Sequence, residues 1–167
     1  MAGEHLVAVC GLYCGACGLY CAWRDNDKEM LEQARQFMSS RQGREYTLKD
    51  LECDGCLANG RLTPYCRECQ MRLCAKAKPG VTRCSDCSDF PCPTITAFNN
   101  DGLRHHAEVL DNIRHLREVG VEAWLKEQSE RWRCPQCGAS VDWYARTCFH
   151  CGATQPYRLP SLPRDKK

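Results

Sequence analysis

The spacing Cys-x-x-Cys occurs six times in this chain of 167 residues. The six pairs are Cys14/Cys17, Cys53/Cys56, Cys66/Cys69, Cys84/Cys87, Cys134/Cys137 and Cys148/Cys151. Two thiolates separated by two residues in a tight turn can face one metal ion, and structural zinc sites use this spacing. A disulfide framework has no reason to repeat one spacing six times, and it needs an oxidising compartment. We therefore expect metal-bound thiolates rather than disulfides.

Composition indicates that metal supplies part of the cohesion of the fold. Sixteen residues are Cys, and without them only about a third of the chain is hydrophobic, which is a small fraction for a core. The formal net charge is +2. Binding of zinc makes it negative, because four thiolates carry more charge than the ion that they hold. This excludes a general electrostatic attraction to nucleic acid, so any such binding must be local.

The sequence also favours a cytoplasmic protein without enzymatic activity. No apolar run approaches the roughly 18 residues of a membrane span, and residues 1–10 lack the pattern of a secretory signal, so we expect no membrane partner. No phosphate loop, nucleophile motif or His-x-Glu deaminase motif is present. His105 and His106 precede Glu108, but consecutive side chains on a helix diverge by about 100°. We expect these histidines to pack or to face solvent, which leaves a Cys triplet with one open coordination position as the catalytic alternative.

Three stretches without Cys have helical periodicity. The residues Asp25-Asn-Asp27 are good caps for a helix that Gly43 ends. A second helix begins near Asp101, and Gly120 separates it from a third that runs from 121 to about 131. We expect a small metal-stabilised α+β fold, in which short helices pack on cysteine-rich loops and hairpins, plus a C-terminal zinc ribbon. The predicted divisions are a cysteine-rich metal-binding domain (1–98), a helical segment (99–131), the zinc ribbon (132–154) and a disordered tail (155–167).

The C-terminal motifs are the most specific metal signal in the chain. Cys134-Pro-Gln-Cys137-Gly and Cys148-Phe-His-Cys151-Gly are nearly identical turns, each with Gly where a positive φ is wanted. The intervening residues 141–144 are expected to form a short strand between two ribbon arms. Four thiolates leave no open coordination position, so we predict structural zinc. We expect the Cys134→Ser substitution to unfold the ribbon locally and to leave residues 1–98 folded.

Eight cysteines between positions 53 and 92 form two further groups. The second quartet is Cys53, Cys56, Cys66 and Cys69, and the third group is Cys74, Cys84, Cys87 and Cys92. We predict two zinc ions among these eight residues. The sequence leaves open whether they pair in order or whether 53/56 share an ion with 84/87. The dipeptide Cys92-Pro also occurs at ferredoxin clusters, so iron is the minority alternative.

The opening motif contains Cys10, Cys14, Cys17 and Cys21. In a continuous helix Cys10 and Cys21 would lie roughly 16 Å apart, too far for one ion, and the intervening glycines favour a non-helical path. This group can bind zinc or a four-iron four-sulfur cluster, for a total of three or four zinc ions with the cluster as alternative. The first three cysteines also match the triplet of radical S-adenosylmethionine enzymes. Ala16 stands where an aromatic residue is usual, however, and the chain is too short for the barrel.

The motifs resemble a known family. The stretches Cys10-Gly-Leu-Tyr-Cys14-Gly-Ala-Cys17, Cys53-Asp-Gly-Cys56, Cys66-x-x-Cys69, Arg72-Leu-Cys74-Ala and Cys84-x-x-Cys87-x-Asp-Phe-Pro-Cys92 are similar in order and wording to the prokaryotic domain-of-unknown-function family 3795. The likeness covers about residues 8 to 98, and Cys21 lies outside the shared pattern. It implies a cysteine-rich scaffold that binds zinc, with no settled activity, to which the C-terminal ribbon is appended.

These observations favour a metal-stabilised interaction module whose partner is a protein, with nucleic acid bound through local basic patches as a further candidate. Residues 61–83 contain six cations against the single acid Glu68, namely Arg61, Arg67, Arg72, Lys76, Lys78 and Arg83. A second basic and aromatic set in the ribbon is Arg131, Arg133, Trp143, Tyr144 and Arg146. Such cations can contact phosphates, or they can offset thiolate charge. The alternative function is an iron–sulfur redox or accessory protein that uses the N-terminal cysteines.

Overall fold

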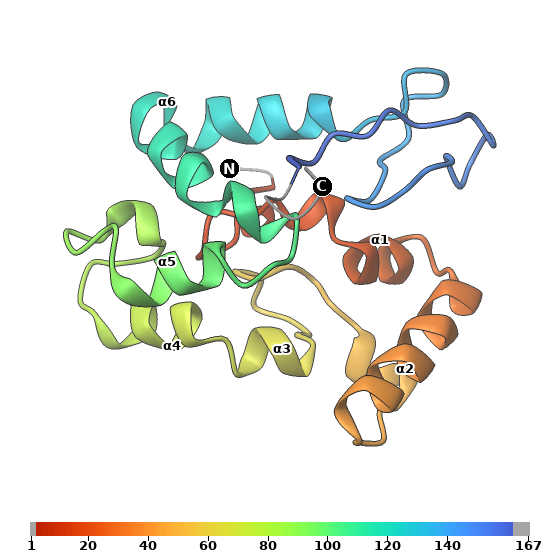
Figure 1. The fold of residues 1–167 in the computed structure, drawn as a ribbon, viewed down its shortest axis with the longest axis horizontal. Coiled ribbons are helices and arrows are strands. Elements are labelled where there is room, and N and C mark those ends of the chain that lie inside the picture. The colour runs from red at the N-terminus through yellow and green to blue at the C-terminus, as the bar shows by residue number, and fades with distance from the viewer. Residues whose placement is uncertain (1–2, 162–167) are drawn as a thin grey trace.

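Helices carry the regular structure of residues 3–161, which are described by a computed structural model (Figure 1). The α-helices are α1 (Gly18–Arg24), α2 (Lys28–Gln42), α3 (Pro64–Arg67), α4 (Gln70–Ala77), α5 (Pro93–Asn99) and α6 (Val109–Arg131). The short 3₁₀-helices are η1 (Glu4–Leu6), η2 (Cys14–Ala16), η3 (Leu48–Leu51), η4 (Cys84–Asp86) and η5 (His106–Glu108). No helix in the described part of the chain is long and apolar enough to cross a membrane.

The β-structure is smaller than the expected α+β class requires. Within residues 3–161 it consists of isolated antiparallel bridges, Val7 with Tyr13, Arg133 with Ser140 and Thr147 with Thr154. The strand predicted at 141–144 does not form. The backbone N–H of Val141 donates to Trp132 O (2.9 Å), whereas that of Trp143 donates to Ala16 O (2.9 Å). Because these two amides, two residues apart, donate to different segments, no β-ladder forms here. The fold is helix-rich, with a C-terminal cysteine cluster.

The predicted ends of the first helix and the break at Gly120 are confirmed, whereas the helix expected to begin near Asp101 begins at Val109. The Asp27 side chain accepts a hydrogen bond from the N–H of Met30 (3.0 Å) at the start of α2, and Gly43 ends this helix in the left-handed conformation (φ 60°). Gly120 has non-helical dihedral angles inside α6 (φ 78°, ψ 169°) and divides it into two helical pieces. A residue with a Cβ atom is strained at that φ, which explains the break at this position.

One hydrophobic cluster joins the two ends of the chain. It contains Val7, Tyr13 and Ala16 from the N-terminal segment, Leu116, Trp124 and Trp132 from α6 and its end, and Cys134, Val141, Cys148 and Leu159 from the C-terminal segment. Figure 1 shows the N-terminal segment running beneath α6, next to the start of the C-terminal loops. Tyr13 meets Trp124 edge-on, with ring centroids 6.3 Å apart. The predicted ribbon therefore shares its core with the predicted domain 1–98.

The final described residues pack against this core, where the sequence analysis predicts a disordered tail. Gln155 and Leu159 are buried. The guanidinium groups of Arg104 and Arg146 stand 5.1 and 4.4 Å from the ring centroid of Tyr157. Two buried side chains and two cation–π contacts hold residues 155–161 despite their prolines. Residues 162–167 of the predicted tail lie outside the described part of the chain.

Candidate metal centre

The C-terminal cysteines lie on two turns of the same construction. The N–H of Cys134 donates to Ala139 O (2.8 Å), and the N–H of Gly138 returns to Cys134 O (2.9 Å). The second turn repeats this with Cys148 and Ala153 (2.7 Å) and with Gly152 and Cys148 (2.8 Å). Gly138 and Gly152 have φ values of 73° and 72°, as the motif predicts. Each turn therefore presents its two thiols from a closed local loop.

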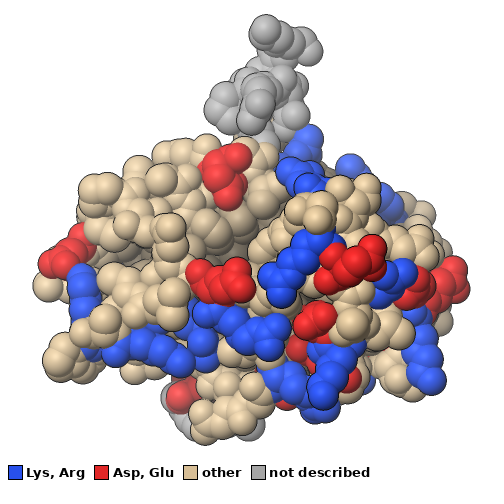
Figure 2. Space-filling model, turned by 90° about the horizontal axis from the view of Figure 1, so that it is seen from below, with Lys and Arg blue, Asp and Glu red and all other residues tan. Residues whose placement is uncertain are grey.

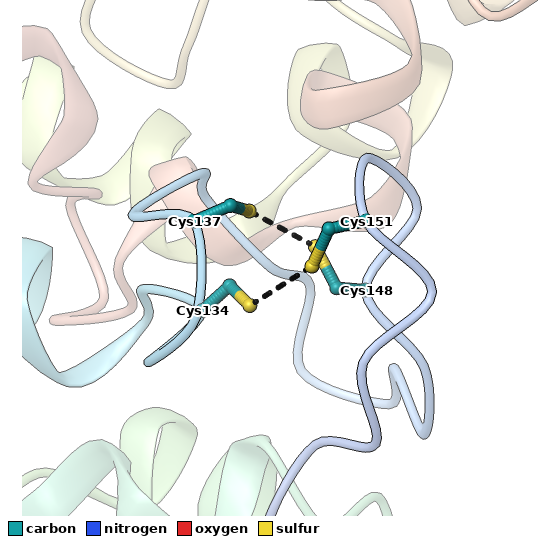
Figure 3. Close-up of side chains that lie close together, drawn as sticks. All are labelled: Cys134, Cys137, Cys148 and Cys151. Atoms are coloured by element: carbon teal, nitrogen blue, oxygen red, sulfur yellow. Dashed lines mark hydrogen bonds between the residues drawn. The ribbon is translucent and has the colours of Figure 1, made fainter.

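The four sulfur atoms already stand at the spacing of a tetrahedral metal site. Cys134 Sγ lies 3.7 Å from Cys151 Sγ, and Cys137 Sγ lies 3.6 Å from Cys148 Sγ. All four ligand atoms lie within 4.8 Å of one another, and Figure 3 shows the side chains converging from two loops. Zinc–sulfur bonds of about 2.3 Å place the sulfurs of a tetrahedron about 3.8 Å apart. The donor set and its spacing therefore fit a tetrahedral thiophilic ion.

The surroundings favour the thiolate form of one ligand. Burial opposes ionisation of Cys134, but the N–H groups of Cys137 and Gln136 and the side chain of Gln155 donate to its sulfur and lower its pKa to about 6. The Gln155 Nε2 atom lies 3.3 Å from Cys134 Sγ. Sequence reasoning missed Gln155 because it follows the last motif and is flanked by no recognisable pattern. Gln155 is therefore a hydrogen-bond donor to a candidate metal ligand and lies outside the set of ligands itself.

Cysteines of the predicted second quartet lie near one another and also near a cysteine of the N-terminal motif. The Cys66 thiol donates a hydrogen bond to Cys53. This hydrogen bond lowers the pKa of Cys53 to about 6 and raises the pKa of Cys66. Cys56 is buried in one hydrophobic cluster together with Cys10, and Cys69 packs against that cluster. The second quartet is therefore not isolated from the other cysteine motifs of the chain.

The N-terminal motif supplies those cysteines. Cys14 Sγ accepts a hydrogen bond from the backbone N–H of Cys56 (3.5 Å). Burial raises the pKa of Cys10, and the neighbouring Cys56 and Cys69 raise it further. The chain is not helical throughout this motif, since η2 and α1 are separate elements, as the 16 Å argument requires. The first and second motifs are therefore interleaved rather than forming separate groups.

Cys17 lies near cysteines of both motifs, Cys14 and Cys53, and Cys21 follows it on α1. Burial raises the pKa of Cys17, and the adjacent Cys53 raises it further. The Cys21 thiol donates to Gly15 O (3.2 Å), and burial raises its pKa to about 12. This hydrogen bond connects Cys21 on α1 to Gly15 of η2, and the predicted role of Cys21 as a metal ligand stays a prediction.

The third predicted group is brought together around one pocket, which Cys74, Cys84, Cys87 and Cys92 line. Burial raises the pKa of Cys84 to about 12, and the neighbouring Cys92, Cys87 and Cys74 add to this. All sixteen cysteines of the chain lie within residues 3–161, and each is a free thiol rather than half of a disulfide. Within that range, the C-terminal four are the group whose ligand atoms are already assembled around a common point.

The basic residues of positions 61–83 are mostly engaged within the molecule. Five of the six make internal contacts: Arg61 with Asp54 (3.0 Å), Arg67 with Asp50 (3.7 Å), Arg72 with Cys56 O (3.2 Å), Lys78 with Asp89 (2.5 Å) and Arg83 with Glu4 O (3.3 Å). On the face in Figure 2, Lys and Arg lie among Asp and Glu rather than in an unbroken positive field. This favours charge compensation over phosphate binding.

The ribbon set is also engaged. Arg131 pairs with Glu108 (2.5 Å), and Trp143 stacks on His105 with ring centroids 4.3 Å apart. His105 Nδ1 lies 2.7 Å from the Tyr144 hydroxyl, while His106 Nδ1 lies 2.7 Å from Asp101 Oδ2. Both histidines pack, as expected, although their rings do not diverge and lie 4.2 Å apart. Their contacts connect the 101–108 segment to the C-terminal loops.

Comparison with known proteins supplies a family but no characterised relative. No curated protein and no solved structure matches the chain. The family model described as "Protein of unknown function (DUF3795)" matches residues 6–97, more than half of the chain. This range includes the N-terminal motif, the second quartet and the third group, and it ends before α6 and the C-terminal cysteine cluster. The chain therefore belongs to this family of proteins of unknown function and carries a further cysteine cluster beyond the matched region.

Proposed function

We propose that this protein is a zinc-stabilised interaction module that binds a protein partner. The observation that carries the proposal is the set of four C-terminal sulfurs at 3.6 and 3.7 Å contact distances. Four thiolates around one ion leave no coordination position for substrate, so the ion acts through the fold rather than through chemistry. Soft thiolate ligands in a tetrahedral arrangement favour zinc among the abundant divalent ions.

The surface supports a protein partner over nucleic acid. Internal contacts compensate most cations of residues 61–83, as described above. Phe149, at the tip of the second cysteine turn, leaves 73% of its surface in solvent. A rigid turn that displays a large apolar side chain is suited to insertion into a hydrophobic pocket of another protein. The metal-bound turn would hold this side chain in place without support from a large core.

Metal content tests the first half of the proposal. Protein purified without oxygen should contain about three to four zinc ions per chain and have no absorbance in the visible range. Removal of zinc by a strong chelator should lower the midpoint of thermal unfolding, and added zinc should restore it. Metal-free protein with an unchanged unfolding transition would contradict the proposal.

Photo-crosslinking tests the second half. A photoreactive phenylalanine analogue at position 149 should form adducts with one protein in cells. The same analogue at position 37 is a matched control, because Phe37 on α2 is also largely exposed (63%). Equal adduct patterns at both positions would show that Phe149 is not a docking residue. Adducts with RNA or DNA at position 149 would favour the nucleic-acid alternative.

A second candidate function rests on the interleaved N-terminal motif. Cys10 and Cys56 are buried in one apolar cluster, with Cys14, Cys69 and Cys84 packed against it. Thiolates in an apolar setting are the usual ligands of iron–sulfur clusters. An iron–sulfur redox or accessory protein would contain about four irons per chain and absorb broadly near 400 nm. That spectrum, in anaerobically purified protein, would replace the zinc proposal for these cysteines.

A further inference from the structure

A groove lies between the α1–α2 connection and the C-terminal loops. One wall comes from α1, α2 and the link between them, and the other comes from residues 140–150. Figure 1 shows these loops above α1. The family model matches α1 and α2 but not the loops. The groove is therefore formed where the family region and the additional cysteine cluster meet. Its apolar lining consists of Ala22, Met30, Val141, Ala145 and Phe149.

Three carboxylates also line this groove, those of Asp25, Asp27 and Asp142. Asp25 is already paired with Arg24 (2.6 Å). Asp27 and Asp142 each accept a hydrogen bond from one backbone N–H, at 3.0 and 2.8 Å. These donors are neutral, so both carboxylates keep their charge. Among the described residues, no Lys or Arg lines the groove or forms an ion pair with Asp27 or Asp142.

The size and the lining of the groove fit the end of one basic side chain. Its volume of about 40 Å³ has room for about three water molecules, which is enough for an extended side chain but not for a chain segment. Lysine and arginine have an aliphatic stem that packs on apolar surface and a cationic head that pairs with carboxylates. A phosphate group would be repelled by the same carboxylates, so the groove favours a protein over a nucleic acid.

Phe149 lies at the edge of this groove and leaves 73% of its surface in solvent. The next residue, His150, also lines the groove, and its Nε2 atom lies 3.8 Å from Asp25 Oδ2. This contact joins the second cysteine turn to the end of α1. An apolar docking residue and an acidic groove are thus side by side on one surface.

We propose that the groove receives a lysine or arginine side chain of the protein partner, while Phe149 contacts an apolar residue next to it. The stem of the basic side chain packs on the apolar lining, and its charged group meets the carboxylates of Asp27 and Asp142. The inference rests on the proposed function and specifies the chemistry of the partner. The recognised surface requires both the family region and the C-terminal loops.

A pair of short acetylated peptides tests the groove on the unchanged protein. One peptide contains lysine between two leucines, and in the other norleucine replaces the lysine, which keeps an aliphatic stem and removes the charge. The lysine peptide should shift the amide resonances of Ala22, Val141 and Ala145 in nuclear magnetic resonance spectra. It should bind at least about tenfold more tightly than the norleucine peptide, and added salt should reduce this difference. Equal affinities, or shifts confined to another surface, would overturn the inference.

The double variant Asp27→Asn/Asp142→Asn removes the charge and keeps the two local hydrogen bonds. Asparagine caps a helix as well as aspartate does, and its side-chain oxygen can still accept the backbone N–H. We expect this variant to lose about tenfold in affinity for the lysine peptide and to leave the affinity for the norleucine peptide unchanged. Asp111→Asn on α6 is the matched control, because Asp111 is exposed and does not line the groove. An equal loss in Asp111→Asn would overturn the inference, and if the double variant does not fold, the peptide pair decides.

Crosslinking from position 149 separates this inference from the proposed function. In cells, Asp27→Asn/Asp142→Asn should lower the yield of the protein adduct about tenfold. An undiminished adduct would overturn the basic occupant and leave the proposed function standing, whereas the absence of a protein adduct in the parent protein would contradict both. Sedimentation tests a second copy of this chain as the occupant. A dimer that Asp27→Asn/Asp142→Asn dissociates would overturn the assignment to a different protein, and a monomer at all concentrations supports it.

Discussion

The C-terminal cysteines and the cysteines that line the α4–α5 pocket differ in how closely the fold brings their sulfur atoms together. The C-terminal turns are closed by their own backbone hydrogen bonds, and their sulfurs lie 3.6 and 3.7 Å apart across the pair. The cysteines of the pocket come from α4, from η4 and from the residue before α5, and within residues 3–161 their sulfurs are not assembled at that spacing. Short turns closed by their own hydrogen bonds thus fix the ligand geometry, whereas motifs on separate helices do not fix it by themselves.

This difference does not make the C-terminal turns an independent unit. Cys134 and Cys148 are buried in the cluster that contains Tyr13 and Ala16, and Trp143 N–H donates to Ala16 O. The hydrogen bonds of the C-terminal turns are therefore local, whereas their hydrophobic core is shared with the N-terminal segment. Three substitutions test these two properties separately.

The largest effect is expected from Cys134→Ser. It removes a buried candidate ligand from a site of a kind that contributes about 10–16 kcal/mol of binding free energy in zinc-finger peptides. Because the core is shared, we now expect unfolding to spread beyond residues 132–154, contrary to the expectation from sequence. Hydrogen exchange should accelerate at least about tenfold both in the C-terminal turns and in residues 7–16. Acceleration confined to 132–161 would restore the view of an appended module.

Trp124→Ala should produce a smaller loss that reports on the shared core alone. The Trp124 side chain is fully buried and meets Tyr13 edge-on. We expect the free energy of unfolding to fall by about 3–5 kcal/mol, since the substitution leaves a large cavity. Denaturant unfolding of the zinc-loaded protein measures it. Leu51→Ala, in the separate cluster around α2, should leave the zinc affinity of the C-terminal turns unchanged. A matching loss of zinc affinity in Leu51→Ala would contradict this division of the core.

The smallest effect is a pH dependence from the contact of His105 with Trp143 and Tyr144, which joins the 101–108 segment to the C-terminal loops. Burial is the main cause that lowers the pKa of His105 to about 3 in the folded protein, whereas an unfolded histidine titrates near 6.5. The unfolded state therefore binds the proton first as the pH falls. This contribution to stability is complete above pH 6.5 and is lost toward pH 3, by at most about 1.4 kcal/mol per pH unit.

His105→Phe should keep the stacking on Trp143 and reduce the decline in stability between pH 7 and pH 5.5. His115→Phe is the control for which the opposite effect is expected, because the hydrogen bond that His115 donates to Glu127 raises the pKa of His115 and stabilises its charged form at low pH. Denaturant unfolding across this range compares the slopes. Equal slopes in wild type and His105→Phe would show that His105 is hydrated in the folded state.

Features controlled by a few neighbouring residues could be predicted from the sequence. Asp27 and Gly43 bound α2 because capping requires an acceptor at one end and a positive φ at the other. Gly120 divides α6 for the same conformational reason. The C-terminal turns follow from the position of glycine after each second cysteine. In each case the governing contacts lie within one turn of the chain.

Tertiary structure alone decided which distant motifs meet. Cysteine spacing shows that Cys53 and Cys56 share a turn, but it does not show that the Cys66 thiol forms a hydrogen bond with Cys53 or that Cys56 is buried with Cys10. The sequence did not predict the burial of Gln155 and Leu159 either. Gln155 is polar, and a single apolar residue among prolines has no periodicity that would indicate burial. The sequence by itself determined the kind of ligand and the local turns, because hydrogen bonds within a few residues fix both. The grouping of thiols depended on helix packing, because contacts between distant segments arise from the whole core.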